Sequence, residues 1–137
     1  MSHSESLQTS LPNGAQAVVI DDSPTMRRIF ERELNSLGIN VKSYNDGNEA
    51  LEALEGTIDE TTLIFSDIQM PSMDGFELCW RLQQAPWYDG TPLVMVSTMS
   101  DASSVIRVLK LGADDFIPKP FNREDLAQII ERVLSHD

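Results

Sequence analysis

The chain has 137 residues, of which 41% are hydrophobic, and a formal net charge of −12 at pH 7. This size and composition fit one domain with a continuous core. The negative charge argues against the phosphate contacts that drive nucleic-acid binding, so we expect no direct binding of DNA or RNA. The chain has no apolar stretch of about 20 residues and no opening signal sequence, so we expect no membrane insertion and a cytoplasmic location.

The first 14 residues are polar and rich in serine, and they end in the turn signal Pro12-Asn13-Gly14. Such a segment buries too little apolar surface to offset the entropy of ordering. We predict a disordered N-terminal lead-in over residues 1–14 and one folded domain over residues 15–137.

Five short apolar runs then alternate with segments of helical periodicity. The predicted strands cover residues 18–20, 41–44, 63–66, 93–96 and 115–117. The predicted helices cover residues 24–37, 47–54, 75–84 and 102–111, and a last helix is marked by apolar residues from 126 to 134. Continuously apolar strands are typical of a sheet covered by helices on both faces. The pattern predicts a doubly wound α/β fold with a five-stranded parallel sheet in the order 2-1-3-4-5.

Reactive residues stand where the apolar runs stop. Asp21 and Asp22 follow the first run, Asp67 the third, Ser97 the fourth and Lys119 the fifth. In an open parallel sheet, functional sites lie beyond the carboxyl ends of the strands. Carboxylates with one hydroxyl and one ammonium can bind a hard divalent cation and a phosphoryl group there. The leading hypothesis is metal-dependent phosphorylation of an aspartate.

The same residues carry a family resemblance. The acidic pair, the D-x-x-M-P-x-M-D-G segment at 67–75, Ser97 and the Lys-Pro-Phe at 119–121 resemble the receiver domain of two-component response regulators, as in chemotaxis regulators. The resemblance covers about residues 16–134. It implies a flavodoxin-like receiver fold and a phosphoryl group accepted from a sensor histidine kinase or a phosphotransfer protein.

Asp67 is the predicted nucleophile, because a carboxylate at the end of a rigid strand can attack phosphorus and form an acyl phosphate. Asp21 and Asp22 are predicted to join Asp67 around Mg²⁺, which takes oxygen ligands. By the resemblance, the backbone carbonyl of Gln69 is a further ligand. The alternative is a structural role, in which Asp67 caps a helix and Asp22 or Ser23 caps the first helix.

Ser97 and Lys119 are predicted to neutralise charge on the phosphoryl oxygens. Thr98 is the alternative hydroxyl. The resemblance also makes the Lys119–Pro120 bond a candidate cis peptide. In the family, signalling couples movement of the hydroxyl, here that of Ser97, to an aromatic residue three positions before the lysine, which here is Phe116. The alternative for Phe116 is a permanent place in the core.

The implied output surface comprises the fourth helix, the fifth strand and the fifth helix. The resemblance implies a downstream protein or an output domain as the partner of this surface, with a phosphorylation-linked dimer as an alternative. The residues that set the phosphoryl lifetime in the family correspond to Gln69, Thr98 and Met99. Because Thr98 restricts access and Met99 is a poor acceptor, we expect slow autodephosphorylation by a self-phosphorylating acceptor that is not a conventional enzyme.

Four alternatives compete with a free-standing receiver. A haloacid-dehalogenase-type phosphatase expects an acid at position 69, where Gln69 stands. In a flavodoxin-like cofactor binder, Asp21 and Asp22 would repel the phosphate. A phosphorylation-independent scaffold normally lacks one of the acidic or lysine positions, and this chain has all of them. The chain could also be the N-terminal receiver of a longer multidomain regulator.

Overall fold

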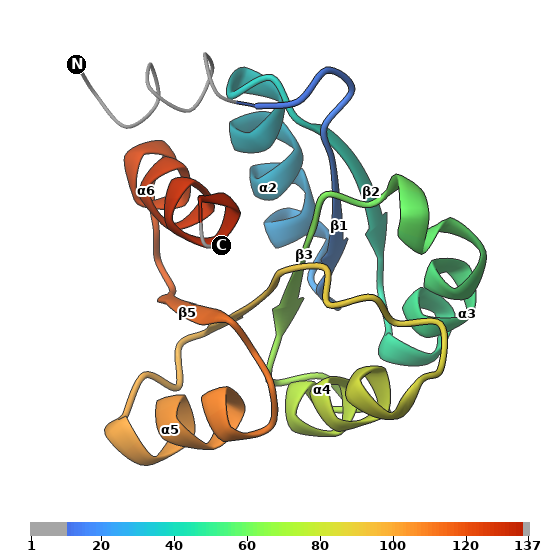
Figure 1. Cartoon of the computed structure of the whole chain (residues 1–137). Helices are drawn as coiled ribbons and strands as arrows, with labels where there is room; N and C mark the ends of the chain where they lie inside the picture. The colour runs from blue at the N-terminus through green and yellow to red at the C-terminus, as the bar shows by residue number, and fades with distance from the viewer. Residues whose placement is uncertain (1–10, 136–137) are drawn as a thin grey trace.

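The computed structural model describes residues 11–135 and contains one parallel sheet (Figure 1). Its strands are β1 (Gln16–Ile20), β2 (Asn40–Tyr44), β3 (Leu63–Asp67), β4 (Leu93–Ser97) and β5 (Asp115–Pro118). Its helices are α2 (Pro24–Ser36), α3 (Gly47–Thr57), α4 (Gly75–Gln84), α5 (Ala102–Lys110), α6 (Arg123–Leu134) and a short 3-10 helix, η1 (Ile58–Glu60). The strand order β2-β1-β3-β4-β5 confirms the predicted fold.

The helices form a layer on each face of the sheet (Figure 1). Helices α2 and α6 pack on one face, around a core that includes Phe30, Leu34 and Ile130. Helices α3, α4 and α5 pack on the other face, around a second core that includes Leu54 and Leu78. The central strands are buried on both faces, which explains their uninterrupted apolar runs.

Helix α3 is longer than the predicted segment 47–54, since it extends to Thr57 and continues into η1. Leu54 and Ile58 are both buried, so the apolar face of the helix continues past Leu54. The Thr57 hydroxyl donates to the Ala53 carbonyl at 2.8 Å within the last turn. Gly56 lies inside the helix, although glycine lowers helix propensity, because packing outweighs that preference.

The predicted lead-in falls mostly on residues 1–10, which lie outside the described residues. Residues 11–14 form a turn in which the Ala15 N–H donates to the Pro12 carbonyl at 3.3 Å. Leu11 packs against the core beneath α2 and α6. The boundary between lead-in and domain stays a prediction. Among the described residues, no helix is long and apolar enough to span a membrane.

The register of the sheet aligns the carboxyl ends of its strands. Ile20 of β1 pairs with Ser66 of β3, and Asp67 at the end of β3 pairs with Val96 of β4. Ser97 at the end of β4 pairs with Pro118 of β5. Residues that follow these strands therefore emerge at one edge of the sheet, as the sequence predicted.

Gly75 determines how closely α4 approaches that edge. The Gly75 N–H donates to the Ile68 carbonyl at 2.7 Å. A Cβ at position 75 would lie 2.6 Å from the Asp67 carbonyl oxygen and 2.6 Å from the Ile68 Cα. The backbone at the end of β3 leaves no room for a side chain here, so glycine is required for α4 to start directly beside it.

Candidate functional site

Three carboxylates converge at the carboxyl edge of the sheet. Asp21, Asp22 and Asp67 each offer an oxygen within 4.8 Å of the others. Asp21 and Asp67 are only 1% and 6% exposed, whereas Asp22 is exposed. The structure thus brings together the three aspartates that the sequence predicted as metal ligands.

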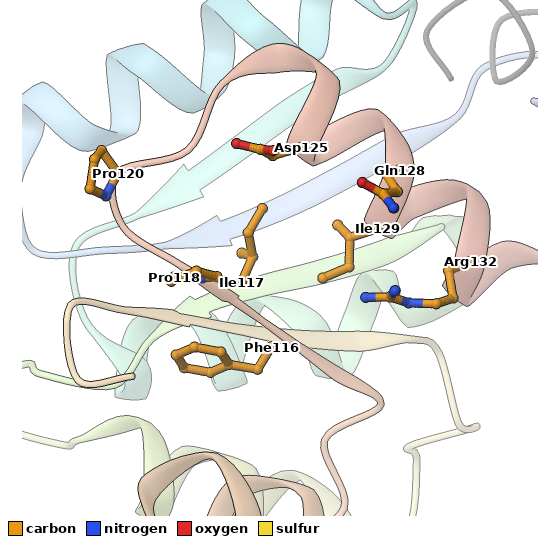
Figure 2. Close-up of a pocket in the computed structure, with 8 residues that line it drawn as sticks. All are labelled: Phe116, Ile117, Pro118, Pro120, Asp125, Gln128, Ile129 and Arg132. Atoms are coloured by element: carbon orange, nitrogen blue, oxygen red, sulfur yellow. The ribbon is translucent and has the colours of Figure 1, made fainter. Parts of the chain in front are cut away.

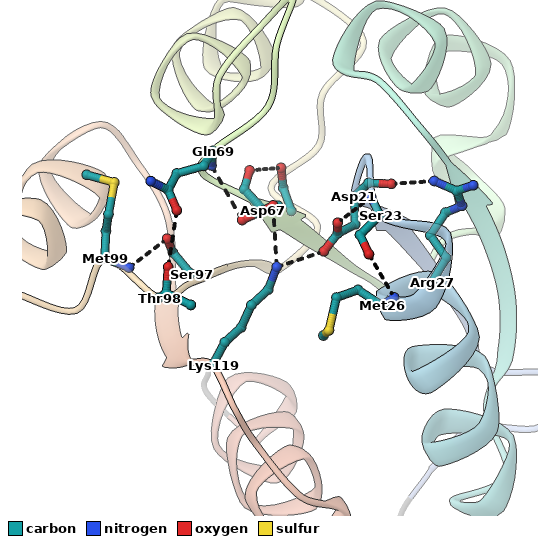
Figure 3. A network of polar contacts seen from close by, with 11 residues as sticks. Asp21, Ser23, Met26, Arg27, Asp67, Gln69, Ser97, Thr98, Met99 and Lys119 are labelled. Carbon is teal, nitrogen blue, oxygen red and sulfur yellow. Dashed lines mark hydrogen bonds and ion pairs between the residues drawn. The ribbon is translucent and has the colours of Figure 1, made fainter.

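The Lys119 ammonium lies between the two buried carboxylates (Figure 3). Its Nζ is 3.0 Å from Asp21 Oδ2 and 3.4 Å from Asp67 Oδ2. The Lys119 N–H donates to the Ser97 carbonyl at 2.9 Å, which ties the residue after β5 to the end of β4. The Lys119–Pro120 bond is cis, as the resemblance implied. Lys119 is therefore part of the carboxylate cluster and not a surface lysine.

The backbone around Asp21 is organised by the start of α2. Asp21 Oδ1 accepts from the Ser23 N–H at 2.9 Å, and Ser23 Oγ accepts from the Met26 N–H at 3.2 Å. Ser23 therefore caps α2, and Asp22 is not its N-cap. Arg27 Nη1 donates to the Asp21 carbonyl at 2.7 Å. Sequence reasoning missed this contact, because α2 carries adjacent arginines and helical periodicity alone does not single out Arg27.

Asp67 also has no capping role, since Asp74 caps α4 by accepting from the Glu77 N–H at 2.9 Å. Burial raises the pKa of the Asp67 carboxyl, and the nearby Asp21 carboxylate raises it further. The Lys119 ammonium and the Gln69 N–H, 3.4 Å from Asp67 Oδ1, act in the opposite direction but do not cancel the effect of burial. A cation added to this cluster would favour the charged form of Asp67.

The hydroxyl positions lie beside the cluster on β4 and its loop. Ser97 is fully buried, and its Oγ accepts from the Met99 N–H at 2.9 Å. The exposed Thr98 donates from its hydroxyl to Gln69 Oε1 at 3.1 Å. Met99 is half-buried and packs against the core beneath α3, α4 and α5. The Thr98–Gln69 bond joins two of the three predicted lifetime positions.

Phe116 is set apart from the carboxylates. It is half-buried on β5 and packs against the same core as Met99. Figure 2 shows its ring on the side of β5 away from α6. Its connection to the site is through the chain, since Lys119 follows three residues later.

The donor set of the cluster fits a hard divalent cation. It consists of carboxylate oxygens, which Mg²⁺ prefers, and the exposed Asp22 leaves one side open for the waters that Mg²⁺ commonly keeps. Two buried carboxylates share a single ammonium, so a negative charge remains to be compensated. The Gln69 peptide lies next to Asp67, but the role of its carbonyl as a ligand stays a prediction.

The fold and the site define a small α/β domain with an aspartate–lysine cluster at the carboxyl edge of its sheet. The family model for the response regulator receiver domain matches residues 17–131, and the chain belongs to this family of two-component signalling. This confirms the family resemblance.

The relatives differ in how much of their length the chain covers. The probable transcriptional regulator ycf27 of Porphyridium aerugineum is 38% identical, over 85% of this chain and 47% of that protein. The Vibrio cholerae chemotaxis protein CheY4 is 31% identical with a TM-score of 0.82, over 88% of this chain and 99% of that chain. The receiver domain of the sensor histidine kinase PA1611 of Pseudomonas aeruginosa, described with a magnesium ion coordinated in its active site cleft, has a TM-score of 0.81 at 24% identity, over 90% of this chain and 99% of that one. The chain spans less than half the length of the first curated relatives it matches.

Asp67→Asn is expected to raise the melting temperature at pH 7 in EDTA by several degrees. In a domain of this size, a gain of about 1 kcal/mol in the free energy of unfolding produces a shift of that order. Folding raises the pKa of Asp67, so its charged form destabilises the fold at pH values above the folded pKa. Below 3.8, the ordinary value, the carboxyl is protonated in both states and the difference should disappear. Differential scanning calorimetry of both proteins between pH 7 and pH values below 3.8 measures this difference in melting temperature.

The matched control is Asp59→Asn, which removes the same charge from an exposed position in η1. It should change the melting temperature much less than Asp67→Asn. An equal increase in both variants would assign the effect to net charge and would contradict the role of burial.

Proposed function

We propose that this chain is a phosphoacceptor receiver that takes a phosphoryl group onto Asp67 from a sensor histidine kinase or a phosphotransfer protein. The observation that carries the proposal is the placement of the Asp67 carboxylate in one cluster with Asp21, Asp22 and the Lys119 ammonium. Three crowded carboxylates repel one another and one ammonium offsets only part of that repulsion, so a purely structural role for Asp67 would not explain this arrangement.

The proposed chemistry is a displacement at phosphorus. An Asp67 carboxylate oxygen forms the new bond to phosphorus, and the bond from phosphorus to the donor breaks with its electron pair remaining on the donor. Lys119 Nζ, 3.4 Å from Asp67 Oδ2, offsets charge on the transferred group. Ser97 Oγ accepts from Met99 N–H, so its own hydrogen remains available for a phosphoryl oxygen.

We further propose Mg²⁺ as the cofactor, held by Asp21, Asp22, Asp67 and the Gln69 carbonyl. Bound there, Mg²⁺ would neutralise negative charge on the carboxylates and on the phosphodonor. The proposal is supported by the all-oxygen donor set, and the receiver of PA1611 described with magnesium has the same fold. Lys119 alone cannot balance the site, because it carries one positive charge among three carboxylates.

The surface formed by α5, β5 and α6 is proposed to be the output surface that changes on phosphorylation. Pro118 and Pro120, on either side of Lys119, line a pocket of about 220 Å³ between β5 and α6 (Figure 2). A displacement of Lys119 would therefore reach this surface directly. On α5, Ile106 and Leu109 are 51% and 43% exposed, as expected for apolar side chains that a partner covers. Ser97 and Phe116 are the proposed switch residues, with burial of Phe116 as the signal.

The partner on this surface is either a separate protein, an output domain or a second copy in a phosphorylation-linked dimer. The relatives that are transcriptional regulators are longer than this chain, so a place as the N-terminal receiver of a multidomain regulator is an alternative. The absence of direct nucleic-acid binding and the cytoplasmic location remain predictions. A phosphorylation-independent scaffold is disfavoured, because Asp21, Asp22, Asp67 and Lys119 are all present.

Incubation with acetyl phosphate and Mg²⁺ is expected to add one phosphoryl group to the protein, on Asp67, and chelation with EDTA should abolish the addition. Intact mass spectrometry with mapping of the modified residue measures both. Asp67→Asn should remain unlabelled, while Asp59→Asn should label like the native protein. Full labelling of Asp67→Asn would refute the proposed function.

Mg²⁺ is expected to raise the melting temperature by mass action, with about 2.7 kcal/mol of stabilisation at a concentration of 100 Kd. Asp22→Asn should remove most of this increase, because it removes one of the three proposed carboxylate ligands. The fold itself should be unaffected, because Asp22 is exposed and does not cap α2. Scanning fluorimetry against Mg²⁺ concentration measures the shift, with Asp59→Asn as the variant that keeps it. An unchanged shift in Asp22→Asn would place the metal elsewhere.

The phosphorylated protein is expected to be long-lived. Thr98→Ala should shorten the lifetime by opening access to phosphorus, and Met99→Glu should shorten it by tens to roughly a hundredfold by orienting the attacking water. The Thr98 hydroxyl donates to Gln69 Oε1 at 3.1 Å, and the Gln69 N–H is 3.4 Å from Asp67 Oδ1, so both side chains belong to the loops beside Asp67. Loss of the phosphoryl group is timed by mass spectrometry after removal of donor. If neither substitution speeds hydrolysis, access and water placement at these positions do not control the lifetime.

A further inference from the structure

A groove of about 470 Å³ lies between α3 and α4, away from the carboxylate site. Both tryptophans of the chain, Trp80 and Trp87, line it together with Leu51. Trp80 is 54% exposed, the largest exposed fraction among the large hydrophobic side chains of residues 11–135. The groove therefore presents two indole rings and an aliphatic side chain on one surface.

The groove is on a different part of the molecule from the proposed output surface. Helices α3 and α4 pack against each other beside the sheet (Figure 1), and α3 follows β2 directly in the chain. Strand β2 forms one edge of the sheet, whereas β5 forms the opposite edge. A partner in this groove would leave the surface of β5 and α6 accessible.

The groove is bordered by negative charge. Glu52 and Glu55 line it from α3, and both are exposed. Arg81 is the basic residue in its lining, and Arg81 is already paired with Glu77 at 2.8 Å within α4. Between Lys42 and Arg81 the chain carries nine carboxylates and no lysine, arginine or histidine. Two exposed carboxylates therefore border the groove, and Arg81, the one cation in its lining, is already paired with Glu77, so the border carries a net negative charge.

Neither feature alone would mark a site. A single exposed apolar side chain is ordinary, and an acidic surface is usually only solvated. Here the two coincide, because the indole rings and Leu51 provide apolar contact area while Glu52 and Glu55 lie at its border. An apolar groove with charged borders is the arrangement by which proteins bind amphipathic segments, with aromatic residues supplying most of the binding energy.

We infer that this groove docks a basic amphipathic segment of a partner protein. Apolar side chains of that segment contact Trp80, Trp87 and Leu51, and its lysines or arginines pair with Glu52 and Glu55. A second copy of this chain is disfavoured as the occupant, because two acidic surfaces in chains of net charge −12 repel each other. The inference does not depend on phosphorylation of Asp67, so either can fail without the other.

Intrinsic fluorescence reports on this groove directly, because both tryptophans line it. The full chain, in EDTA and without phosphodonor, is titrated with an amphipathic helical peptide of lysine and leucine. Two matched peptides serve as comparison: one has glutamate in place of lysine, and one has the same composition scrambled to remove the apolar stripe. We expect a saturable blue shift with the first peptide and at least about tenfold weaker binding of the other two. Equal binding of all three would overturn the inference.

Charge variants separate the groove from the overall field. Glu52→Gln combined with Glu55→Gln should weaken binding of the lysine–leucine peptide about tenfold by calorimetry. Asp59→Asn combined with Glu60→Gln makes the same charge change at exposed positions outside the lining, and it should weaken binding much less. Equal weakening by both pairs would mean that only net charge attracts the peptide, and it would refute the inference.

Trp80→Ala should also weaken binding about tenfold, while Ile106→Ala, a truncation of an exposed apolar residue on α5, should not. Unaltered binding in Trp80→Ala would contradict the inference. Sedimentation velocity without peptide tests the other occupant. A dimer of the native chain that Trp80→Ala abolishes would show that the groove is filled by a second copy, and would likewise overturn the proposal.

Discussion

The buried carboxylates of Asp21 and Asp67 share the ammonium of Lys119, and the order of the strands is what brings these three side chains together. Asp21 and Lys119 are 98 positions apart in the chain, yet their side chains form a 3.0 Å contact. Strands β3 and β4 lie between β1 and β5, so this contact exists only when the sheet is assembled in its full order. A carboxylate buried without a cationic partner is costly, so the contacts with Lys119 are what allow two acidic side chains to lie at this buried edge of the sheet.

Much of the fold was predictable because its pattern is dictated by burial. Strands β3 and β4 are buried along their whole length, and only continuously apolar runs satisfy that condition. The grouping of Asp21, Asp22, Asp67 and Lys119 was predictable for a related reason, since parallel strands bring their carboxyl ends to the same edge. The end of α3 was predicted too early, because the buried face of the helix continues past Leu54 to Ile58 despite Gly56 between them.

The contacts that adjust the site were not predictable, because they depend on side-chain geometry within loops. Arg27 reaches the Asp21 carbonyl from a helix that also carries Arg28 and Arg32, both exposed. The Thr98 hydroxyl pairs with Gln69 across two different loops, 29 positions apart. Spacing along a strand or helix does not encode such pairs. The family resemblance implied lifetime roles for Gln69 and Thr98 but none for Arg27, and the structure shows which groups these side chains contact.

Strand β5 has a further consequence for how partners can bind. It lies at the edge of the sheet, which would ordinarily offer unpaired backbone groups to a strand from another chain. Pro118, its last residue, and Pro120 lack an N–H, and Arg132 of α6 closes over the strand by bonding Asp115 at 2.7 Å. These features disfavour extension of the sheet across molecules at this edge. Association here must rely on side chains and helix surfaces, which allows a signalling contact to form and dissociate without the risk of irreversible strand exchange.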